Sequence, residues 1–446
     1  MTTIIKASAI ITNSKQGIIR DGFISISGNR ITDIGLQKNL TTQTLNSTTV
    51  LDWNDRILSP GFVQTHIHLC QTLFRGLADD LLLLDWLQKR IFPFENAHSE
   101  SSMKASAQLG LAEMLANGTT TIMDMGSVRH YEQVLETAIA MGMRGYFGKA
   151  LMDANDLFPA LMDTTSNELK NAESQLKTYH HAADDRIRYA MTPRFILSCS
   201  DELLVSSKAI ARKYDDVLYH THSSEQQAEL AVIRQKYGYD NVDYFDHLGL
   251  LDSKTLLAHC VWLNENEKNV IREKNVKILH CPSSNLKLGS GVALIPELKE
   301  SGISVSIGAD GAPCNNNLDP FVEMRLAALI QKPRLNPTAM PAKQVFEMAT
   351  IGGAEALGLE SQIGSLEVGK KADFIGLNLN KIWNPLLLES VQSIYSAIVY
   401  SSQKENVTDV WIDGRVIKKG GELLGVNEEQ IFHQSGSELK KLLDRV

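Results

Sequence analysis

The chain has 446 residues, of which 43% are hydrophobic and 22% charged, and its formal net charge is -8 at pH 7. This length exceeds the size at which a single hydrophobic core stops growing, so we expect about two domains in a globular protein of ordinary composition. The negative charge and the lack of any long basic stretch argue against a nucleic acid or an anionic membrane as partner.

The chain start carries no basic region followed by an apolar core and a cleavage site, and no segment is apolar enough to span a membrane. The five cysteines are widely scattered and form no Cys-x-x-Cys pair. An odd number of cysteines without a secretory leader is typical of reduced thiols. We therefore expect a soluble, cytoplasmic protein.

The two ends of the chain are both rich in short strands with turn residues between them. We predict the N-terminal strands at Ala7–Ile11, Phe23–Ser27, Arg30–Ile34 and Val50–Trp53. Near the other end we predict a turn and strand in Gly364–Ile375, and a hairpin that joins Val407–Ile412 to Val416–Ile417. The pattern predicts a small β-sandwich domain from residues 1–59 and 366–425, and a C-terminal helical segment over 426–446.

The middle of the chain, residues 60–365, alternates apolar strands with amphipathic helices. The predicted strands are Phe62–His68, Thr119–Met125, Arg144–Leu151, Ile187–Phe195, Val217–His222, Thr255–Cys260, Val276–Cys281 and Ile303–Asp310. The predicted helices between them include Ser102–Ala116, Asp201–Lys213, Ser224–Tyr237 and Asn264–Lys274. Eight such strands predict an α/β fold of the (β/α)8 TIM barrel type. A doubly wound open sheet is the alternative, but no Gly-x-Gly-x-x-Gly motif follows an early strand.

Polar residues capable of chemistry recur where these strands end, which is where functional residues of a TIM barrel lie. Strand residues alternate between two faces, so the His-x-His pair of the first strand aims two imidazoles at one point. The residues at the strand ends are His66, His68, Arg194, His220, His222, His259, His280 and Asp310.

A catalytic zinc ion takes nitrogen and carboxylate ligands and keeps one position for water. The simplest ligand set is His66, His68, His222 and Asp310. The set predicts one divalent metal, zinc, although iron or manganese could use the same ligands. The metal would activate a water molecule, and Asp310 could accept its proton. A two-metal site would need a lysine at the end of the fourth strand, which has none; Lys149, on the third strand, is expected to be packed or salt-bridged.

Three further residues are candidates for catalysis. Glu225 follows His222 where strand turns into helix, so it could shuttle a proton between water and substrate; the alternative is an acid of the first helical turn. His259 could hydrogen-bond the attacking water or an electrophilic ring. His280 is either a catalytic residue or a buried structural histidine.

The motifs together resemble the amidohydrolase superfamily over essentially the whole chain. The matching motifs are Pro60–His68, His222–Glu225, Ala258–Cys260, His280–Leu288 and Gly308–Asp319. Within the superfamily the chain resembles the methylthioadenosine/S-adenosylhomocysteine deaminases and the related 5'-deoxyadenosine deaminases, on the segments Gln71–Gly76, Asp85–Leu87 and Met324–Leu326. This resemblance implies the same four metal ligands, with Glu225 and His259 acting on the purine. It also implies that Glu95 hydrogen-bonds ribose hydroxyls, with Trp86 nearby.

One position departs from that family. Where many of its members carry a substrate-binding histidine, this chain has Arg194 in a Thr-Pro-Arg-Phe sequence that resembles guanine deaminases. The arginine offers a rigid fork of donors to a ring acceptor or a sugar oxygen. The exact substrate is therefore open, but the reaction class is not.

The expected reaction is hydrolytic deamination of a small-molecule purine nucleoside at C6, to the inosine analogue and ammonia. The candidate substrates are 5'-deoxyadenosine, 5'-methylthioadenosine, S-adenosylhomocysteine and adenosine. Alternatives are hydrolysis of another nitrogen heterocycle, such as guanine, a pterin or a triazine losing amine or chloride, and a non-catalytic scaffold of the same fold. The superfamily resemblance also favours a homo-oligomer.

Overall fold

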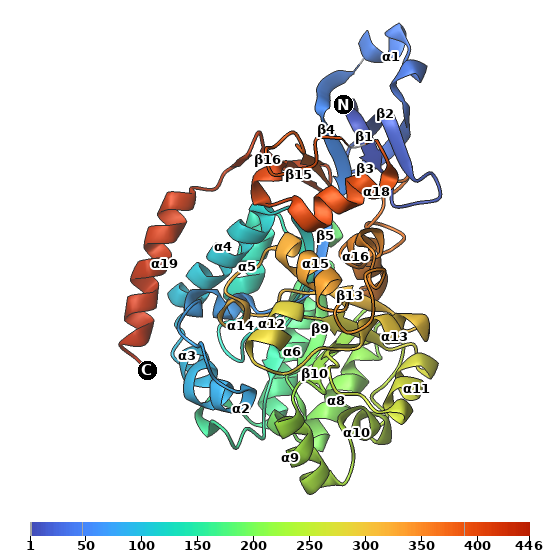
Figure 1. Cartoon of the computed structure of the whole chain (residues 1–446). Coiled ribbons are helices and arrows are strands. Elements are labelled where there is room, and N and C mark those ends of the chain that lie inside the picture. The colour runs from blue at the N-terminus through green and yellow to red at the C-terminus, as the bar shows by residue number, and fades with distance from the viewer. Residues whose placement is uncertain (1, 47, 388) are drawn as a thin grey trace. The chain divides into compact units, whose positions relative to one another are not determined.

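The computed structural model describes residues 2–46, 48–387 and 389–446, and its helices and strands are labelled in Figure 1. The chain divides into two compact units. One comprises the segment up to Gln64 together with Ala112–Thr121 and Asp319–Val426, and the other comprises Thr65–Leu111, Ile122–Leu318 and Asn427–Val446. The domain boundaries expected after residues 59, 365 and 425 stay a prediction.

Eight parallel strands form a nearly closed barrel, as predicted. In sheet order they are β5 (Phe62–Ile67), β6 (Thr119–Met125), β7 (Arg144–Gly148), β9 (Ile187–Pro193), β10 (Leu218–Ser223), β11 (Thr255–His259), β12 (Lys277–His280) and β13 (Val305–Ile307). The first and last strands meet where Ile67 forms a parallel bridge with Asp310. The strands are buried on both faces, which is why each appears in the sequence as a short apolar run.

Helices surround the barrel (Figure 1). The helices that come before the fourth barrel strand in the chain are α2 (Leu83–Trp86), α3 (Phe92–Asn96), α4 (Glu100–Ala116), α5 (Glu132–Met141), α6 (Thr165–Tyr179) and α7 (Ala182–Asp185). Those further along are α8 (Asp201–Ala211), α9 (Gln227–Tyr237), α10 (Asn241–His247), α11 (Glu265–Glu273), α12 (Pro282–Lys287), α13 (Ile295–Glu300) and α14 (Ala312–Asn315). Near the C-terminus lies α19 (Glu428–Leu443). Asn264, predicted as the first helical residue of α11, is its N-cap and forms a capping box with Glu267.

The third barrel strand is interrupted, which the sequence did not predict. It stops at Gly148 and a two-residue strand, β8 (Ala150–Leu151), follows and pairs with β9. The interrupting residue, Lys149, places its ammonium 2.6 Å from Oε2 of Glu168. Both side chains of this pair are buried. The expectation of a salt-bridged Lys149 is thereby confirmed.

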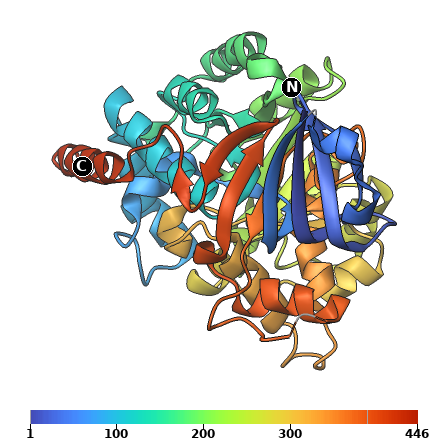
Figure 2. The ribbon, with the colours of Figure 1, turned by 90° about the horizontal axis from the view of Figure 1, so that it is seen from above.

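Both chain ends together build one β-sheet that is separate from the barrel. This sheet corresponds to the small β-sandwich domain that was predicted from the two ends of the chain. Its eight strands run in the order β17 (Glu422–Leu423), β16 (Arg415–Lys419), β15 (Val407–Ile412), β14 (Phe374–Leu377), β4 (Thr49–Pro60), β1 (Thr2–Ile11), β2 (Ile18–Ser27) and β3 (Arg30–Leu36). Figure 2 shows the blue N-terminal strands beside the red C-terminal ones. Apolar side chains from both ends, among them Ile5, Trp53, Phe374 and Trp411, form one buried cluster. Helices α1 (Thr42–Asn46), α15 (Pro320–Leu329), α16 (Ala342–Met348), α17 (Ile351–Ala356) and α18 (Val391–Ser396) belong to the same unit.

The structure also bears on two features considered in the sequence, membrane-spanning segments and cysteines. Over the part of the chain that the structure describes, no helix has the length and apolarity needed to cross a bilayer. All five cysteines, Cys70, Cys199, Cys260, Cys281 and Cys314, are buried and are not disulfide-bonded in the described part of the chain.

Barrel closure depends on a close backbone approach at Gly308. Its N–H donates to the His280 carbonyl, and a Cβ atom built on it would lie 2.7 Å from the backbone N and O of His66. We expect Gly308→Ala to lower the free energy of unfolding by about 1–3 kcal/mol, because backbone atoms cannot rotate away as a side chain would. Urea unfolding measures this change.

The matched control is Gly436→Ala in helix α19, where an added Cβ meets nothing within 4 Å. Since alanine favours helix over glycine, this variant should be stabilised by up to about 1 kcal/mol. Equal unfolding midpoints for the two variants would contradict the importance of the close approach at Gly308.

Candidate metal and catalytic site

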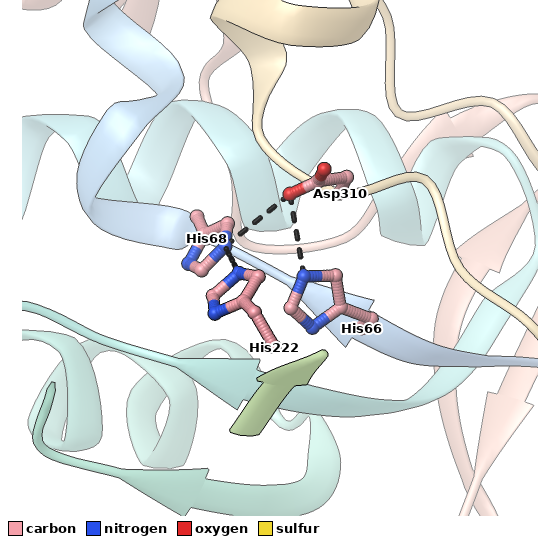
Figure 3. Close-up of side chains that lie close together, drawn as sticks. All are labelled: His66, His68, His222 and Asp310. Carbon is pink, nitrogen blue, oxygen red and sulfur yellow. Dashed lines mark hydrogen bonds and ion pairs between the residues drawn. The ribbon is translucent and has the colours of Figure 1, made fainter. Parts of the chain in front are cut away.

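Four side chains from three barrel strands converge at the C-terminal end of the barrel (Figure 3). His66 and His68 come from β5 and the residue that follows it, His222 from β10, and Asp310 from the segment after β13. One donor atom from each of the four lies within 4.8 Å of the others. Nε2 of His66 and of His68 lie 3.4 and 3.2 Å from Oδ1 of Asp310. The four residues predicted as metal ligands are thus brought together.

Backbone carbonyls fix the orientation of two of these rings. Nδ1 of His68 donates to the Met125 carbonyl and Nδ1 of His222 to the Arg194 carbonyl, each at 2.7 Å. With the proton on Nδ1, each neutral ring presents an Nε2 lone pair to the centre, and the two Nε2 atoms are 3.2 Å apart. Burial holds the pKa of His222 well below its usual value, so its ring does not readily take up a second proton.

This arrangement fits a divalent metal ion. Two lone pairs that face each other repel unless a cation lies between them, and burial also lowers the pKa of His66 to about 4, which favours its neutral, ligating form. Nε2 of His66 is buried without a hydrogen-bond partner among the described residues, and the carboxylate of Asp310 lies 3.4 Å from it. Three imidazoles and one carboxylate form a nitrogen and oxygen donor set of the kind that zinc, iron and manganese accept.

The backbone at this end of the barrel adopts left-handed conformations at non-glycine residues. The φ angles are 53° at Ser224, 72° at His259, 48° at Cys260 and 64° at Asp310. Such conformations cost about 1–3 kcal/mol each and cluster at functional sites. They turn the chain sharply as it leaves the strands, which brings the side chains of His259 and Asp310 over the barrel mouth.

Glu225 lies beside the four clustered residues, two positions before helix α9 begins. Helix α9 begins at Gln227, so the alternative interpretation of Glu225 as a helix-terminal acid is wrong. Its Oε2 lies 3.5 Å from Nε2 of His259, and Ser290 Oγ lies 3.4 Å from its Oε1. Burial raises the pKa of Glu225 to about 7, a value suited to taking up and releasing a proton near neutral pH.

His259 is oriented from its other ring nitrogen. Nδ1 lies 2.9 Å from Oδ1 of Asn285, an oxygen that can only accept, so Nδ1 carries the proton. Nε2 then points between Glu225 and Asp310, 3.8 Å from Oδ2 of the latter. Burial lowers the pKa of His259, but the negative charges of Glu225 and Asp310 outweigh it and raise the pKa overall.

A pocket opens over these groups, with about 420 Å³ of empty space when its solvent-open mouth is included. Its lining combines the site residues with apolar side chains, as is usual for small-molecule sites. It is lined by His68, Gln71, Leu83, Trp86, Leu87, Arg194, Phe195, His222, Glu225, Glu229, His259, Leu288 and Asp310. Of the predicted substrate contacts, Trp86, Arg194 and Glu225 therefore line the pocket.

Glu95 is buried behind this lining and is not part of it. One carboxylate oxygen accepts from Arg194 Nη1 at 2.7 Å, and the other accepts from Gln71 Nε2 at 2.8 Å. The Arg194 guanidinium also lies over the Phe92 ring, 5.2 Å from its centroid. Glu95 thus holds two pocket residues in place in this structure.

His280 ends β12 and is fully buried, but it is not part of the pocket lining. Neither of its ring nitrogens has a hydrogen-bond partner among the described residues, and burial lowers its pKa to about 3. His280 therefore lies outside the pocket lining, and both alternatives for its role, catalytic and structural, stay predictions.

Besides the apolar residues of the lining, three polar residues of the site were not predicted from the sequence. Gln71 and Glu229 line the pocket, and Asn285 orients His259. The carboxylate of Glu229 also accepts the backbone N–H of Glu225 at 3.1 Å. The available signals were local: Gln71 follows His68 by three residues, and Glu229 follows Glu225 by four.

Comparison with known proteins gives consistent matches over most of the chain. Residues 57–417 match the Amidohydrolase family. The chain is 40% identical to a 5'-deoxyadenosine deaminase of Methanothermobacter thermautotrophicus, over 93% of each chain. It is 34% identical to a 5-methylthioadenosine/S-adenosylhomocysteine deaminase of Bacillus cereus over the full length of both. A crystal structure of an adenosine deaminase from Xanthomonas campestris with bound zinc superposes with a TM-score of 0.90 at 28% identity, over 99% of this chain and 98% of the other.

Proposed function

This chain belongs to the amidohydrolase family, and from that membership we propose that it hydrolytically deaminates a 5'-modified adenosine to the inosine analogue and ammonia. The observation that carries the proposal is the cluster of His66, His68, His222 and Asp310 with Glu225 beside it. The similarity to deaminases of 5'-deoxyadenosine and 5-methylthioadenosine over nearly the whole chain favours such a nucleoside as substrate.

We propose that the four clustered residues hold one divalent metal, zinc. The presence of bound zinc in the Xanthomonas campestris relative supports this proposal. Iron and manganese are the alternatives with the same donors. Bound there, the metal lowers the pKa of a water molecule toward neutrality, which supplies the nucleophile.

The side chains around this centre have distinct roles in the proposed reaction. Asp310 accepts the proton of the attacking water. Glu225, with its pKa near 7, protonates the purine ring nitrogen as C6 is attacked. Asp310 then returns the proton taken from water to the amino group, which leaves as ammonia, and the remaining hydroxyl proton at C6 passes to Glu225 as the C6 carbonyl forms. His259, oriented by Asn285, hydrogen-bonds the developing charge at C6.

The test is incubation of metal-loaded protein with 5'-deoxyadenosine, 5'-methylthioadenosine, S-adenosylhomocysteine, adenosine and guanine, followed by ultraviolet spectra and ammonia release. We expect the highest kcat/KM for a 5'-modified adenosine. Turnover of guanine without turnover of any adenosine would refute the preferred substrate and leave the reaction class intact.

Guanine is the second candidate, because the pocket wall carries groups suited to an oxopurine. Arg194 offers donors there, and Oε1 of Gln71 is buried without a partner among the described residues. The carbonyl oxygen of guanine could accept from Arg194, and the adjacent ring N–H of guanine could donate to Oε1 of Gln71. Glu95, the residue expected to bind a ribose, is occupied by Arg194 and Gln71 instead.

The Glu95–Arg194 pair gives a testable prediction. Replacing Glu95 by Gln preserves its shape but removes the charge that holds Arg194. We expect KM for the preferred substrate to rise about 10-fold or more, since a 1 Å displacement of a binding group is costly. We expect a smaller change in kcat.

Glu168→Gln is the matched control, since it removes the carboxylate of the other buried pair, with Lys149. Both variants should lose stability, because each leaves a buried cation unpaired. Only Glu95→Gln should raise KM, as determined from steady-state kinetics at several substrate concentrations. A normal KM in Glu95→Gln would exclude a role for the pair in substrate binding.

A cytoplasmic location and a homo-oligomeric state stay predictions. The non-catalytic alternative is the least supported, because all proposed ligands and Glu225 are present in one cluster.

A further inference from the structure

A buried carboxylate, Asp124, lies next to the metal-binding cluster and has no role in the reaction proposed above. It is fully buried near the end of β6, and the residue after it, Met125, supplies the carbonyl that orients the His68 ring. Oδ1 of Asp124 accepts the backbone N–H of Leu69 at 2.8 Å. The last two residues of β6 therefore hold both the ring of His68 and the peptide that follows it.

The second oxygen of Asp124 is held just as firmly. Oδ2 accepts from the hydroxyl of Tyr131 at 2.8 Å, and Tyr131 is itself fully buried. The Tyr131 ring packs directly on Gly126, where an added Cβ would lie 1.8 Å from Cε2. The glycine after Met125 thus makes room for the tyrosine that fixes Asp124.

Asp124 forms no ion pair in the part of the chain that the structure describes. A buried carboxylate without a cation is costly, and two hydrogen bonds from neutral donors offset that cost only in part. A dication held by His68 would supply positive charge to this carboxylate. Groups behind a metal-bound histidine fix and strengthen the ligand; here the Met125 carbonyl accepts from the His68 ring, and Asp124 holds the Leu69 peptide beside it.

We infer that Asp124, held by Tyr131, is a positioning residue that strengthens metal binding through His68. The inference rests on the proposed metal centre and extends it to a residue that touches neither metal nor substrate. Asp124 would contribute in two ways, through its negative charge and through its hydrogen bond to the Leu69 backbone.

The test is titration of the metal-free protein with Co²⁺ in the presence of a competing chelator, followed by visible absorption. In Asp124→Asn the side chain keeps its size and Oδ1 can still accept from Leu69, so the variant removes mainly the charge. We expect its Co²⁺ affinity to fall about 10- to 100-fold. Tyr131→Phe keeps the charge but frees one oxygen, and we expect a smaller but measurable loss.

Glu267→Gln is the matched control. Glu267 is also a buried carboxylate that accepts two backbone N–H groups, from Asn264 and Val242, but it lies on helix α11. Its variant should bind Co²⁺ as the unaltered protein does. Thermal unfolding of each metal-free variant separates a loss of affinity from a loss of fold.

The outcomes are distinguishable. If the unaltered protein binds no Co²⁺, the proposed metal centre fails and the inference fails with it. If the unaltered protein binds Co²⁺ and folded Asp124→Asn binds it equally well, only the inference is overturned. Should Asp124→Asn not fold, an unchanged affinity of Tyr131→Phe overturns it.

Discussion

Replacing Glu225 by Gln is expected to lower kcat for the preferred substrate by about 10³-fold, within the range found for loss of a general acid or base. The amide is close in size to the carboxyl but cannot take up and release a proton near neutral pH. The pKa of about 7 makes the native carboxyl suited to that exchange, and its place beside His259 puts it above the barrel mouth. Steady-state kinetics with ammonia detection measures the loss.

The metal content of this variant is its internal control. Glu225 is not one of the four clustered ligands, so Glu225→Gln should retain the metal of the unaltered protein, as measured by elemental analysis. A variant with full metal and full activity would show that another group carries the proton. Glu229, which contacts the backbone of Glu225, would then be the next residue to replace.

Removal of the metal with a chelator is expected to abolish activity, to below about one thousandth of the starting rate, because the metal would lower the pKa of the water that attacks the ring. Adding back Zn²⁺ should restore the rate, and comparison with Fe²⁺ and Mn²⁺ identifies the preferred ion. The metal-free protein should also unfold at a lower temperature, since a ligand that binds only the folded state stabilises it.

Asp310→Asn complements this experiment. It should lower metal content and activity together, because a neutral amide is a much weaker ligand than a carboxylate. If the chelated protein deaminates at the original rate, the one-metal mechanism is wrong, whatever the geometry of the cluster.

The sequence predicted the barrel well because buried parallel strands appear as apolar runs that end in polar residues. Strand β6 has the bounds predicted for it, and the ligands at the strand ends lie together as expected. The break at Lys149 was missed because it depends on a partner 19 residues away, Glu168. Such a pairing has no local signal.

Substrate contacts were harder to predict for the same reason. Glu95 was expected to face a ribose, but its position behind the pocket wall results from contacts with Arg194, 99 residues away, and Gln71. Asp124 gave no signal either, because a single acid inside an apolar strand can be recognised as important only when its neighbours in space are known.

Arg194 contributes to the site through two chemically separate parts. Its carbonyl oxygen orients His222, whereas its guanidinium belongs to the pocket wall with Glu95. Every residue type carries the same carbonyl, so exchanging the side chain at this position should leave the His222 ring aligned. The Met125 carbonyl serves His68 in the same way. Substrate preference can therefore diverge among related enzymes, or be redesigned in the laboratory, without rebuilding the reactive centre each time.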